Sequence, residues 1–256
     1  MQKKCLSILL MVFLLGTLSL AAILVEPSRF ILKIEPGKRE SGSITVINTG
    51  TLPADLKAVL YDWDLSEAGE LVEFQAKTRT DSLDGLIKFN PRQFTIQPGK
   101  AQIVRFTIDA PQDGLEHKGV VFFEESFVPP SGTIGATVTT KVGPIFYVAP
   151  TNIELALQFN DIRVVQENNQ TFFKVLALNN GKGHIRLTIS YKLQTKEGKT
   201  LKEDALPEQV ILPGKSVNQL FSIADNLQSG SYRLIVVLSY FGYTRFNEGV
   251  LEFSIP

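Results

Sequence analysis

The chain has 256 residues, with 26 basic and 26 acidic side chains, so its formal net charge at neutral pH is zero. Hydrophobic residues make up 44% and charged residues 20% of it, which is typical of a protein that buries a core. The balanced charge argues against nucleic acid as a partner, because nucleic-acid-binding proteins carry a basic surface. This length is sufficient for two domains of ordinary size.

The first predicted element is an export signal over residues 1–21. Lys3 and Lys4 precede an apolar run, and Ser19-Leu20-Ala21 has the small-x-small pattern of a cleavage site. We therefore expect the mature chain to start near Ala22 and to reside in the periplasm or at the exterior of the cell envelope.

The mature chain is expected to hold no cysteine, because the only one, Cys5, lies within the signal. Its fold must then depend on burial and not on disulfides. No later segment is long and apolar enough to predict a membrane span.

The rest of the chain predicts β-strands only, in two halves with the same order of parts. Alternating segments such as "ITVINTG" and "QFTIQPGKAQIVRFTID" in the first half correspond to "FKVLALNNG" and "QVILPGKSVNQLFSIAD" in the second. Short alternating strands with regular turns are typical of immunoglobulin-like sandwiches. We predict an all-β protein of two tandem antiparallel sandwiches, with domains 22–150 and 151–256. Pro150 marks the boundary, because proline cannot donate to a sheet.

A Pro-Gly-Lys turn recurs three times, at residues 36–38, 98–100 and 213–215. Proline fixes φ at the first central position and glycine takes a positive φ at the second, so we expect type II turns. Asn48-Thr49-Gly50 and Asn179-Asn180-Gly181 predict tight turns at matching places in the two halves.

The sequence predicts neither an enzyme nor a cofactor or metal site. The two histidines, His117 and His184, fit no ligand or triad spacing and are expected on surface loops. Glu124 and Glu125 are adjacent, so they should point to opposite faces of a strand and cannot act as a pair.

One segment, Asp62–Glu73, partly matches a calcium-binding loop. Its acidic side chains fall at ligand positions, but Glu67 occupies the position that requires glycine. We interpret the segment as a hairpin in which Trp63 and Leu65 point inward and the carboxylates lie in solvent.

Four features of the first half occur in the order known from one protein family. They are Arg29, Asn48 followed by Leu52-Pro53, "PRQFTIQPGKAQIVRFT" and "EHKGVVFFEESFVPP". In these features, over about residues 29–147, the chain resembles the periplasmic chaperones of pilus (fimbrial) assembly; the second half resembles them in architecture only. The resemblance implies a non-enzymatic chaperone that caps pilus or other surface-fibre subunits by β-strand addition. It also implies an outer-membrane assembly pore as a second candidate partner.

The resemblance implies two sets of site residues. Ile134, Ala136 and Val138 would form the strand that is lent to the subunit. Arg29 and Lys141 would bind the carboxylate at the subunit's C-terminus, the alternatives being a solvated arginine and an ordinary edge-strand lysine. Gly143-Pro144 is expected to interrupt the strand after Lys141.

Two other classes of function stay open at this point. The first is a structural or adhesive envelope protein whose modules act as spacers or bind at the cell surface. The second is a carbohydrate-binding module in which Tyr240, Phe241 and Tyr243 stack on sugars.

Overall fold

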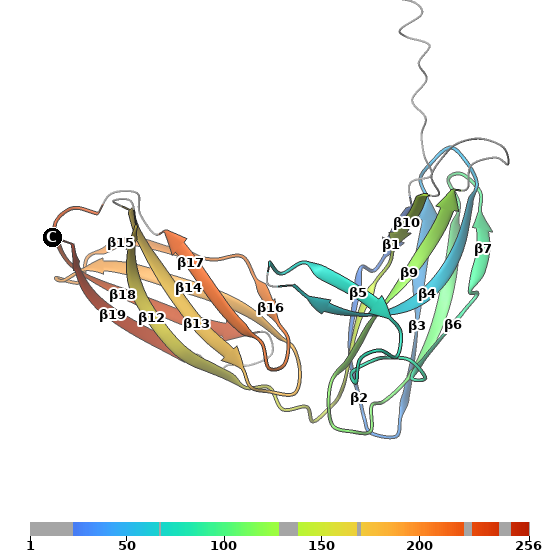
Figure 1. Ribbon diagram of the computed structural model, residues 1–256, viewed down its shortest axis with the longest axis horizontal. Coiled ribbons are helices and arrows are strands. Elements are labelled where there is room, and N and C mark those ends of the chain that lie inside the picture. The colour runs from blue at the N-terminus through green and yellow to red at the C-terminus, as the bar shows by residue number, and fades with distance from the viewer. Residues whose placement is uncertain are drawn as a thin grey trace, which may run out of the picture. The chain divides into compact units, whose positions relative to one another are not determined.

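A computed structural model describes residues 23–66, 68–127, 138–167, 170–222, 227–240 and 247–255. Within these ranges every helix or strand element is a β-strand, and the strands form antiparallel sheets (Figure 1). Contacts divide the chain into two compact units: residues up to Pro111 with His117–Val148, and Gln112–Glu116 with residues from Ala149 onward. The predicted all-β fold of two immunoglobulin-like sandwiches is confirmed. The predicted signal, residues 1–21, lies outside the described residues.

The first unit is a sandwich of two sheets. One sheet has the order β1-β3-β8-β6, formed by β1 (Ile23–Glu26), β3 (Arg39–Asn48), β8 (Ala101–Asp109) and β6 (Ile87–Asn90). The other has the order β2-β11-β9-β4-β5, formed by β2 (Arg29–Ile34), β11 (Ile145–Pro150), β9 (His117–Phe127), β4 (Ala54–Leu65) and β5 (Leu71–Gln75). Two further strands join the second sheet: β10 (Val138–Val142) pairs with β9, and β7 (Gln93–Ile96) pairs with β4. The facing sides share one core, in which Ile44, Val46 and Val104 have no exposed surface.

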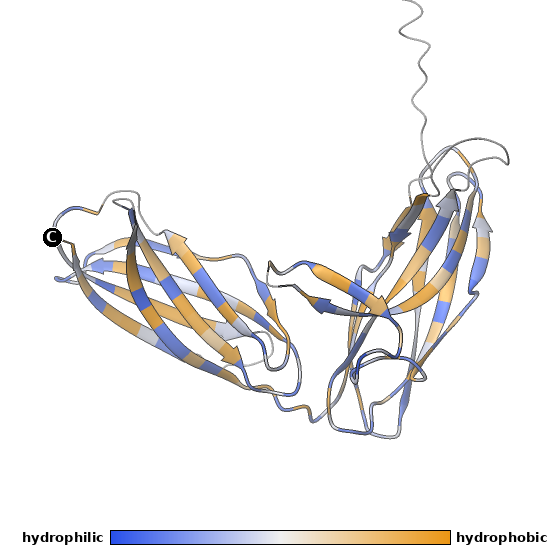
Figure 2. Cartoon of the chain, viewed as in Figure 1, coloured by the Kyte–Doolittle hydropathy of each residue, from blue (hydrophilic) through white to orange (hydrophobic). Residues whose placement is uncertain are grey.

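The second unit repeats this architecture. Its smaller sheet has the order β12-β13-β17, formed by β12 (Leu157–Glu167), β13 (Gln170–Asn179) and β17 (Ser216–Ser222). Its larger sheet has the order β15-β14-β18-β19, formed by β15 (Thr200–Ala205), β14 (Ile185–Thr195), β18 (Gly230–Tyr240) and β19 (Asn247–Ile255), while β16 (Gln209–Ile211) pairs with β14. Burial alternates along β14 and β18, because one side of each strand faces the core. Polar and apolar residues alternate with burial along β14, whereas β18 is apolar throughout Leu234–Leu238 (Figure 2). Phe173 and Leu234 are fully buried there.

The three Pro-Gly-Lys turns adopt the predicted conformation. Gly37, Gly99 and Gly214 have φ of 78°, 70° and 73°, and the next lysine N–H donates to the carbonyl three residues earlier in each turn. Two of the turns also dock on the matching asparagines: Gly99 N–H donates to the Asn48 carbonyl, and Gly214 N–H to that of Asn179, both at 2.8 Å. The repeated turn is thus part of a repeated packing unit.

The longer connection of the first unit, between β5 and β6, closes one end of its core. Leu83 from this segment has no exposed surface and joins the core cluster. Asp62, at the end of β4, accepts hydrogen bonds from the backbone N–H groups of Thr78 and Arg79 and from the Ser82 hydroxyl, at 2.9, 3.0 and 2.5 Å. The carboxylate therefore substitutes for sheet partners that this irregular segment lacks.

Candidate functional site

One open edge of the larger sheet in the first unit is formed by β10. This strand pairs with β9 from Val138 opposite Phe127 to Val142 opposite Phe123. No described strand pairs with its other side. Residues 138–141 are all exposed, and Val138 keeps 55% of its surface exposed. Unpaired backbone groups on such an edge can accept another strand.

The predicted interruption at Gly143-Pro144 is only a local one. β10 ends at Val142 and β11 begins at Ile145, yet Ile145 lies opposite Val120, so both strands advance by three residues and the register is preserved. The Pro144 carbonyl accepts a hydrogen bond from Val121 N–H at 3.2 Å. A Cβ at Gly143 would lie 1.8 Å from the Val121 carbonyl oxygen, so glycine is required there. β10 is therefore aligned by the same strand, β9, that holds β11.

The predicted donor residues fall only partly within the described chain. Ile134 and Ala136 lie outside it. Val138 is the first residue of β10, and the side chains of Val138, Thr140 and Val142 share one face of the strand. Val142 packs against the core of the first unit, whereas Val138 is exposed. The described part of the face thus offers one free apolar side chain.

The two predicted anchor cations belong to the same sheet but are not in contact there. Arg29 opens β2 and is exposed, and its side chain forms no hydrogen bond or ion pair with any described residue. Its neighbour Ser28 accepts from Ile145 N–H at 3.1 Å. Lys141 lies four residues before Ile145, about 13 Å along an extended chain. The shared binding of a carboxylate by Arg29 and Lys141 stays a prediction.

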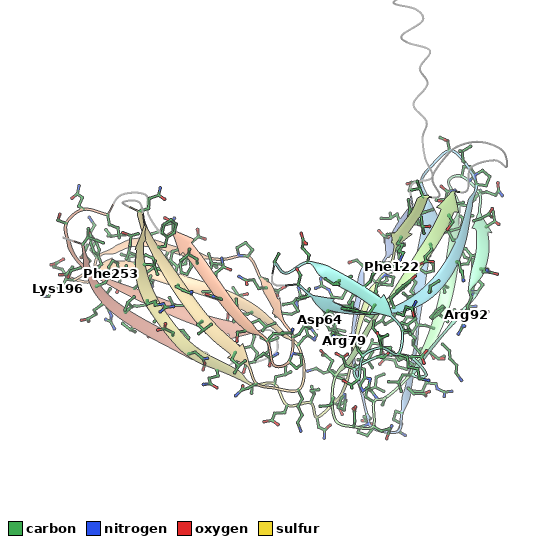
Figure 3. All side chains as sticks on the ribbon, in the orientation of Figure 1. Asp64, Arg79, Arg92, Phe122, Lys196 and Phe253 are labelled. Atoms are coloured by element: carbon green, nitrogen blue, oxygen red, sulfur yellow. The ribbon has the colours of Figure 1, made fainter. Side chains whose placement is uncertain are left out.

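Lys141 is instead surrounded by groups of its own sheet. Its Nζ lies 2.6 Å from Glu73 Oε1 on β5 and 3.6 Å from Glu124 Oε1 on β9. The same amine is 4.3 Å from the ring centroid of Tyr61 on β4, and the Tyr61 hydroxyl donates to Glu124 at 2.6 Å. Hydrogen bonding to Glu73 raises the pKa of Lys141 far above its usual value, although burial acts in the opposite direction. The hydrogen bond to Glu124 raises the pKa of Tyr61. We call Glu73, Glu124, Tyr61 and Phe122 the lysine cage; Figure 3 labels Phe122, whose ring centroid lies 5.9 Å from Nζ.

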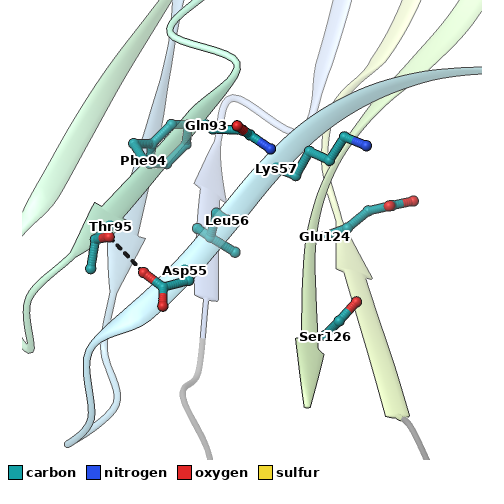
Figure 4. A pocket seen from close by; sticks show the side chains of 8 residues that line it. All are labelled: Asp55, Leu56, Lys57, Gln93, Phe94, Thr95, Glu124 and Ser126. Atoms are coloured by element: carbon teal, nitrogen blue, oxygen red, sulfur yellow. Dashed lines mark hydrogen bonds between the residues drawn. The ribbon is translucent and has the colours of Figure 1, made fainter. Parts of the chain in front are cut away.

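A shallow pocket of about 480 Å³ opens beside the cage. It forms where β4 leaves β9 to pair with β7, beyond the opposed residues Lys57 and Glu124. In Figure 4 the side chains of Lys57 and Glu124 reach over the hollow from neighbouring strands, and Asp55 accepts a hydrogen bond from the Thr95 hydroxyl at 2.5 Å. The remaining lining residues are Leu56, Gln93, Phe94 and Ser126. The hollow has both polar and apolar surface and carries both signs of charge.

The hairpin prediction for Asp62–Glu73 is correct, but its carboxylates are not all in solvent. β4 and β5 pair from Tyr61 opposite Gln75 to Leu65 opposite Leu71, and Trp63 is 1% exposed. Asp62 is also 1% exposed, and Asp64 pairs with Arg79 at 3.0 Å (Figure 3). The sequence did not predict the burial of Asp62 or the ion pair of Asp64, because their partners lie beyond the hairpin.

The described residues contain no group of three or more His, Cys, Asp or Glu side chains placed to hold a metal.

The prediction of surface histidines is wrong. His184 is 7% exposed; its Nδ1 lies 2.7 Å from Glu116 Oε2, and its backbone N–H donates to Glu116 Oε1. His117 begins β9, and its Nδ1 lies 2.8 Å from the Ser82 carbonyl oxygen.

Tyr240, proposed for a sugar platform, is 8% exposed and belongs to the core of the second unit. Its companions Phe241 and Tyr243 lie outside the described residues.

Comparison with known proteins shows which of them this chain resembles. No family model matches the chain. The probable fimbrial chaperone EcpE of Escherichia coli O157:H7 is 27% identical over 109 residues, 40% of this chain and 46% of that relative. This chain is similar to the fimbrial chaperones. The resemblance predicted from the sequence is thereby confirmed, over a match of less than half the length of that curated relative.

Two solved structures share the fold. The class 5 fimbriae chaperone CfaA is 17% identical, with a TM-score of 0.54, and the likeness covers 92% of this chain and all of CfaA. A chain of the chaperone–tip adhesin complex of CFA/I fimbriae biogenesis is 16% identical, with a TM-score of 0.52, over 91% of this chain and 98% of that one. At such identities the likeness establishes the fold.

The sequence did not identify the lysine cage. Glu73 and Lys141 are separated by 68 positions and meet because β5 and β10 belong to one sheet. The available signals were the aromatic residues Tyr61 and Phe122 at alternate positions of predicted strands, but their pairing depends on register.

Among the described residues no helix is long and apolar enough to cross a membrane.

Proposed function

We propose that this protein is a non-enzymatic chaperone of the periplasm that captures pilus or surface-fibre subunits by β-strand addition. The observation that carries the proposal is the open edge of β10, which is exposed, held in register by β9 and unpaired on its other side within the described chain. The subunit would add a strand there and cover its own exposed edge. Similarity to fimbrial chaperones in both sequence and fold supports this role.

The edge offers two kinds of interaction. Backbone N–H and C=O groups of residues 138–142 would supply main-chain hydrogen bonds, which are independent of sequence. Val138, with Ile134 and Ala136 before it, would supply apolar side chains for the subunit's groove. An outer-membrane pore that receives the complex is a second proposed partner.

The test places a charge on the donated face. Val138→Lys should leave the fold intact, because this side chain is 55% exposed. Burying an unpaired ammonium in an apolar groove costs several kcal/mol, so capture should fall by about a hundredfold or more. The measurement is co-purification of a fimbrial subunit from the same organism, secreted together with the tagged protein. The matched control is Val250→Lys on β19, where Val250 is 43% exposed.

Equal losses in both variants would contradict strand addition at β10. If the wild-type protein captures no subunit, the proposed function itself is wrong, and the structural or adhesive alternative takes precedence.

A further inference from the structure

The lysine cage lies on the face of β10 opposite to the side chains that the proposed function assigns to the subunit. Lys141 is directly opposite Glu124 in the β9–β10 pair, so both side chains are on one face. Val138, Thr140 and Val142 occupy the other face, because successive side chains alternate across a strand. Contacts of Lys141 therefore hold β10 from behind and leave its donated face open.

Lys141 also links strands that are not neighbours. Its amine bonds to Glu73 on β5, which ends the order β9-β4-β5, and lies over the Tyr61 ring on the intervening β4. The side chain of Lys141 thus reaches from an open edge at one side of β9 to the edge strand beyond β4. Within the described part of the chain β10 is hydrogen-bonded to one strand, β9, so the contacts of Lys141 add a second link between β10 and its sheet.

The amine is poorly placed for a partner's carboxylate. Two carboxylates of its own sheet already lie within 4 Å of it, at 2.6 and 3.6 Å, and its side chain is only 27% exposed. A third carboxylate would be bound next to Glu73 and Glu124, where like charges repel.

We propose that Lys141 is a positioning residue, which with Glu73 and Tyr61 fixes β10 as a straight, paired edge ready for strand addition, and that it does not anchor the partner's carboxylate. Glu73 thereby becomes a residue required for capture, although it lies on another edge of the sheet. This inference rests on the proposed function, but its first test does not.

The first test measures hydrogen exchange of the β10 amides in the free protein. Glu73→Gln and Lys141→Gln should each speed exchange of residues 138–142 by about threefold to tenfold, as expected for a partly exposed ion pair reinforced by an aromatic ring. The double variant should be no faster than Lys141→Gln, because that substitution already removes the ion pair with Glu73. Lys141→Arg keeps the cation and should exchange nearly as the wild type does.

The matched control is Glu203→Gln, which removes an exposed ion pair with Lys192 at 3.0 Å on edge strand β15 of the second unit. It should leave β10 exchange unchanged. Exchange in the core strand β3 should be the same in all variants. Faster exchange of β3 amides would identify a folding defect in that variant, and the comparison then uses the other Gln variant. Unchanged β10 exchange in both Gln variants would overturn the proposal.

The second test separates positioning from anchoring through capture of the fimbrial subunit. If Lys141 positions β10 through Glu73, Glu73→Gln and Lys141→Gln should lower capture by similar factors. If Lys141 anchors the partner's carboxylate, Glu73→Gln frees the amine, so capture should be unchanged or stronger, and the proposal is overturned. Failure of the wild type to capture any subunit would contradict the proposed function, while the exchange result would still decide whether Lys141 fixes β10.

Discussion

Asn48 and Asn179 occupy equivalent places in the two units and make the same three side-chain hydrogen bonds. Each amide nitrogen donates to two carbonyls: those of Leu52 and Ile96 for Asn48, and those of Gly183 and Ile211 for Asn179. Each amide oxygen accepts the N–H two residues later. Both side chains have no exposed surface, so each amide supplies hydrogen bonds to backbone groups from inside the fold.

Replacing such an amide should be costly. Asn179→Ala removes one hydrogen bond from each of two carbonyls and one N–H, and we expect the second unit to lose about 2–4 kcal/mol of unfolding free energy. Urea denaturation measures the change. The adjacent, exposed Asn180→Ala keeps its backbone bond to Ala156 and should change stability by less than about 0.5 kcal/mol. Similar effects of the two substitutions would contradict the role of the side chain.

Glu125 poses the opposite case, a buried carboxylate with an incomplete set of partners. It is 5% exposed, and its Oε2 has no hydrogen-bond partner among the described residues. Burial raises its pKa above the usual value; the hydrogen bond from Asp55 N–H acts against this, and the Asp55 charge adds to it. Its neighbour Glu124 points to the other face, as predicted from their adjacency.

The raised pKa fixes the sign of a pH effect. Above the folded-state pKa the buried charge destabilises the fold, and this cost disappears as the pH falls through that pKa, because the folded state takes up the proton first. Glu125→Gln should therefore be more stable than the wild type at neutral pH, and the gap should close in mildly acidic buffer. Urea unfolding at both pH values measures it, with exposed Glu40→Gln as the control. A variant that is less stable at neutral pH would show that the charged form is required.

At the scale of elements, strands and turns could be predicted from the sequence, but the register in which β10 and β11 pair with β9 could not. Alternation in "FKVLALNNG" and positive-φ glycines depend on neighbouring residues, so both could be predicted, and both are confirmed by β13 and by Gly99. Gly143-Pro144 was interpreted as an interruption because each residue alone weakens a strand. The structure shows a close approach to Val121 with the register preserved, which depends on β9, some twenty residues away.

The junction between β10 and β11 should accordingly be intolerant of a side chain. In Gly143→Ala the new Cβ would overlap the Val121 carbonyl oxygen at 1.8 Å, so backbone must shift. We expect a loss of about 2 kcal/mol or more, with faster hydrogen exchange on both sides of the junction. Gly230→Ala is a matched strand control, because its Cβ would meet Tyr232 at an ordinary 3.7 Å. Tolerance of both substitutions would refute the close approach.

At the scale of the whole molecule, the duplicated architecture was predictable but the membership of one segment was not. The β8–β9 connection lies in the first half of the chain, yet Gln112–Glu116 belong to the second unit. Glu116 is buried there against His184, and its N–H donates to the Lys182 carbonyl at 3.2 Å. Nothing local in the sequence marks this pairing, since both residues are polar and sit between predicted strands.

In the proposed function, capture of a subunit is a property of the whole molecule, and Arg29 is the predicted anchor whose side chain has no partner among the described residues. It is exposed, has no ion pair among the described residues, and follows Ser28, which binds the first residue of β11. A guanidinium can bind a carboxylate through two parallel hydrogen bonds. Because that contact exists only with a partner, Arg29→Ala should change stability by less than about 0.5 kcal/mol. Losing a charge-assisted bond of about 1.5–3 kcal/mol should weaken capture about tenfold to a hundredfold.

Competition gives the most direct measurement of this effect. Wild type and Arg29→Ala, carrying different tags, are secreted together with a limiting amount of one fimbrial subunit, and the ratio of the two complexes gives their relative affinity. Arg105→Ala, an exposed arginine on β8, serves as the control and should compete equally with wild type. The experiment is repeated with a subunit extended by glycines at its C-terminus, which displaces the carboxylate. The advantage of wild type should then vanish, because Arg29 has lost its ligand in both complexes. An advantage that persists would show that Arg29 contacts some other group of the subunit, and equal capture of the unmodified subunit would remove Arg29 from the site.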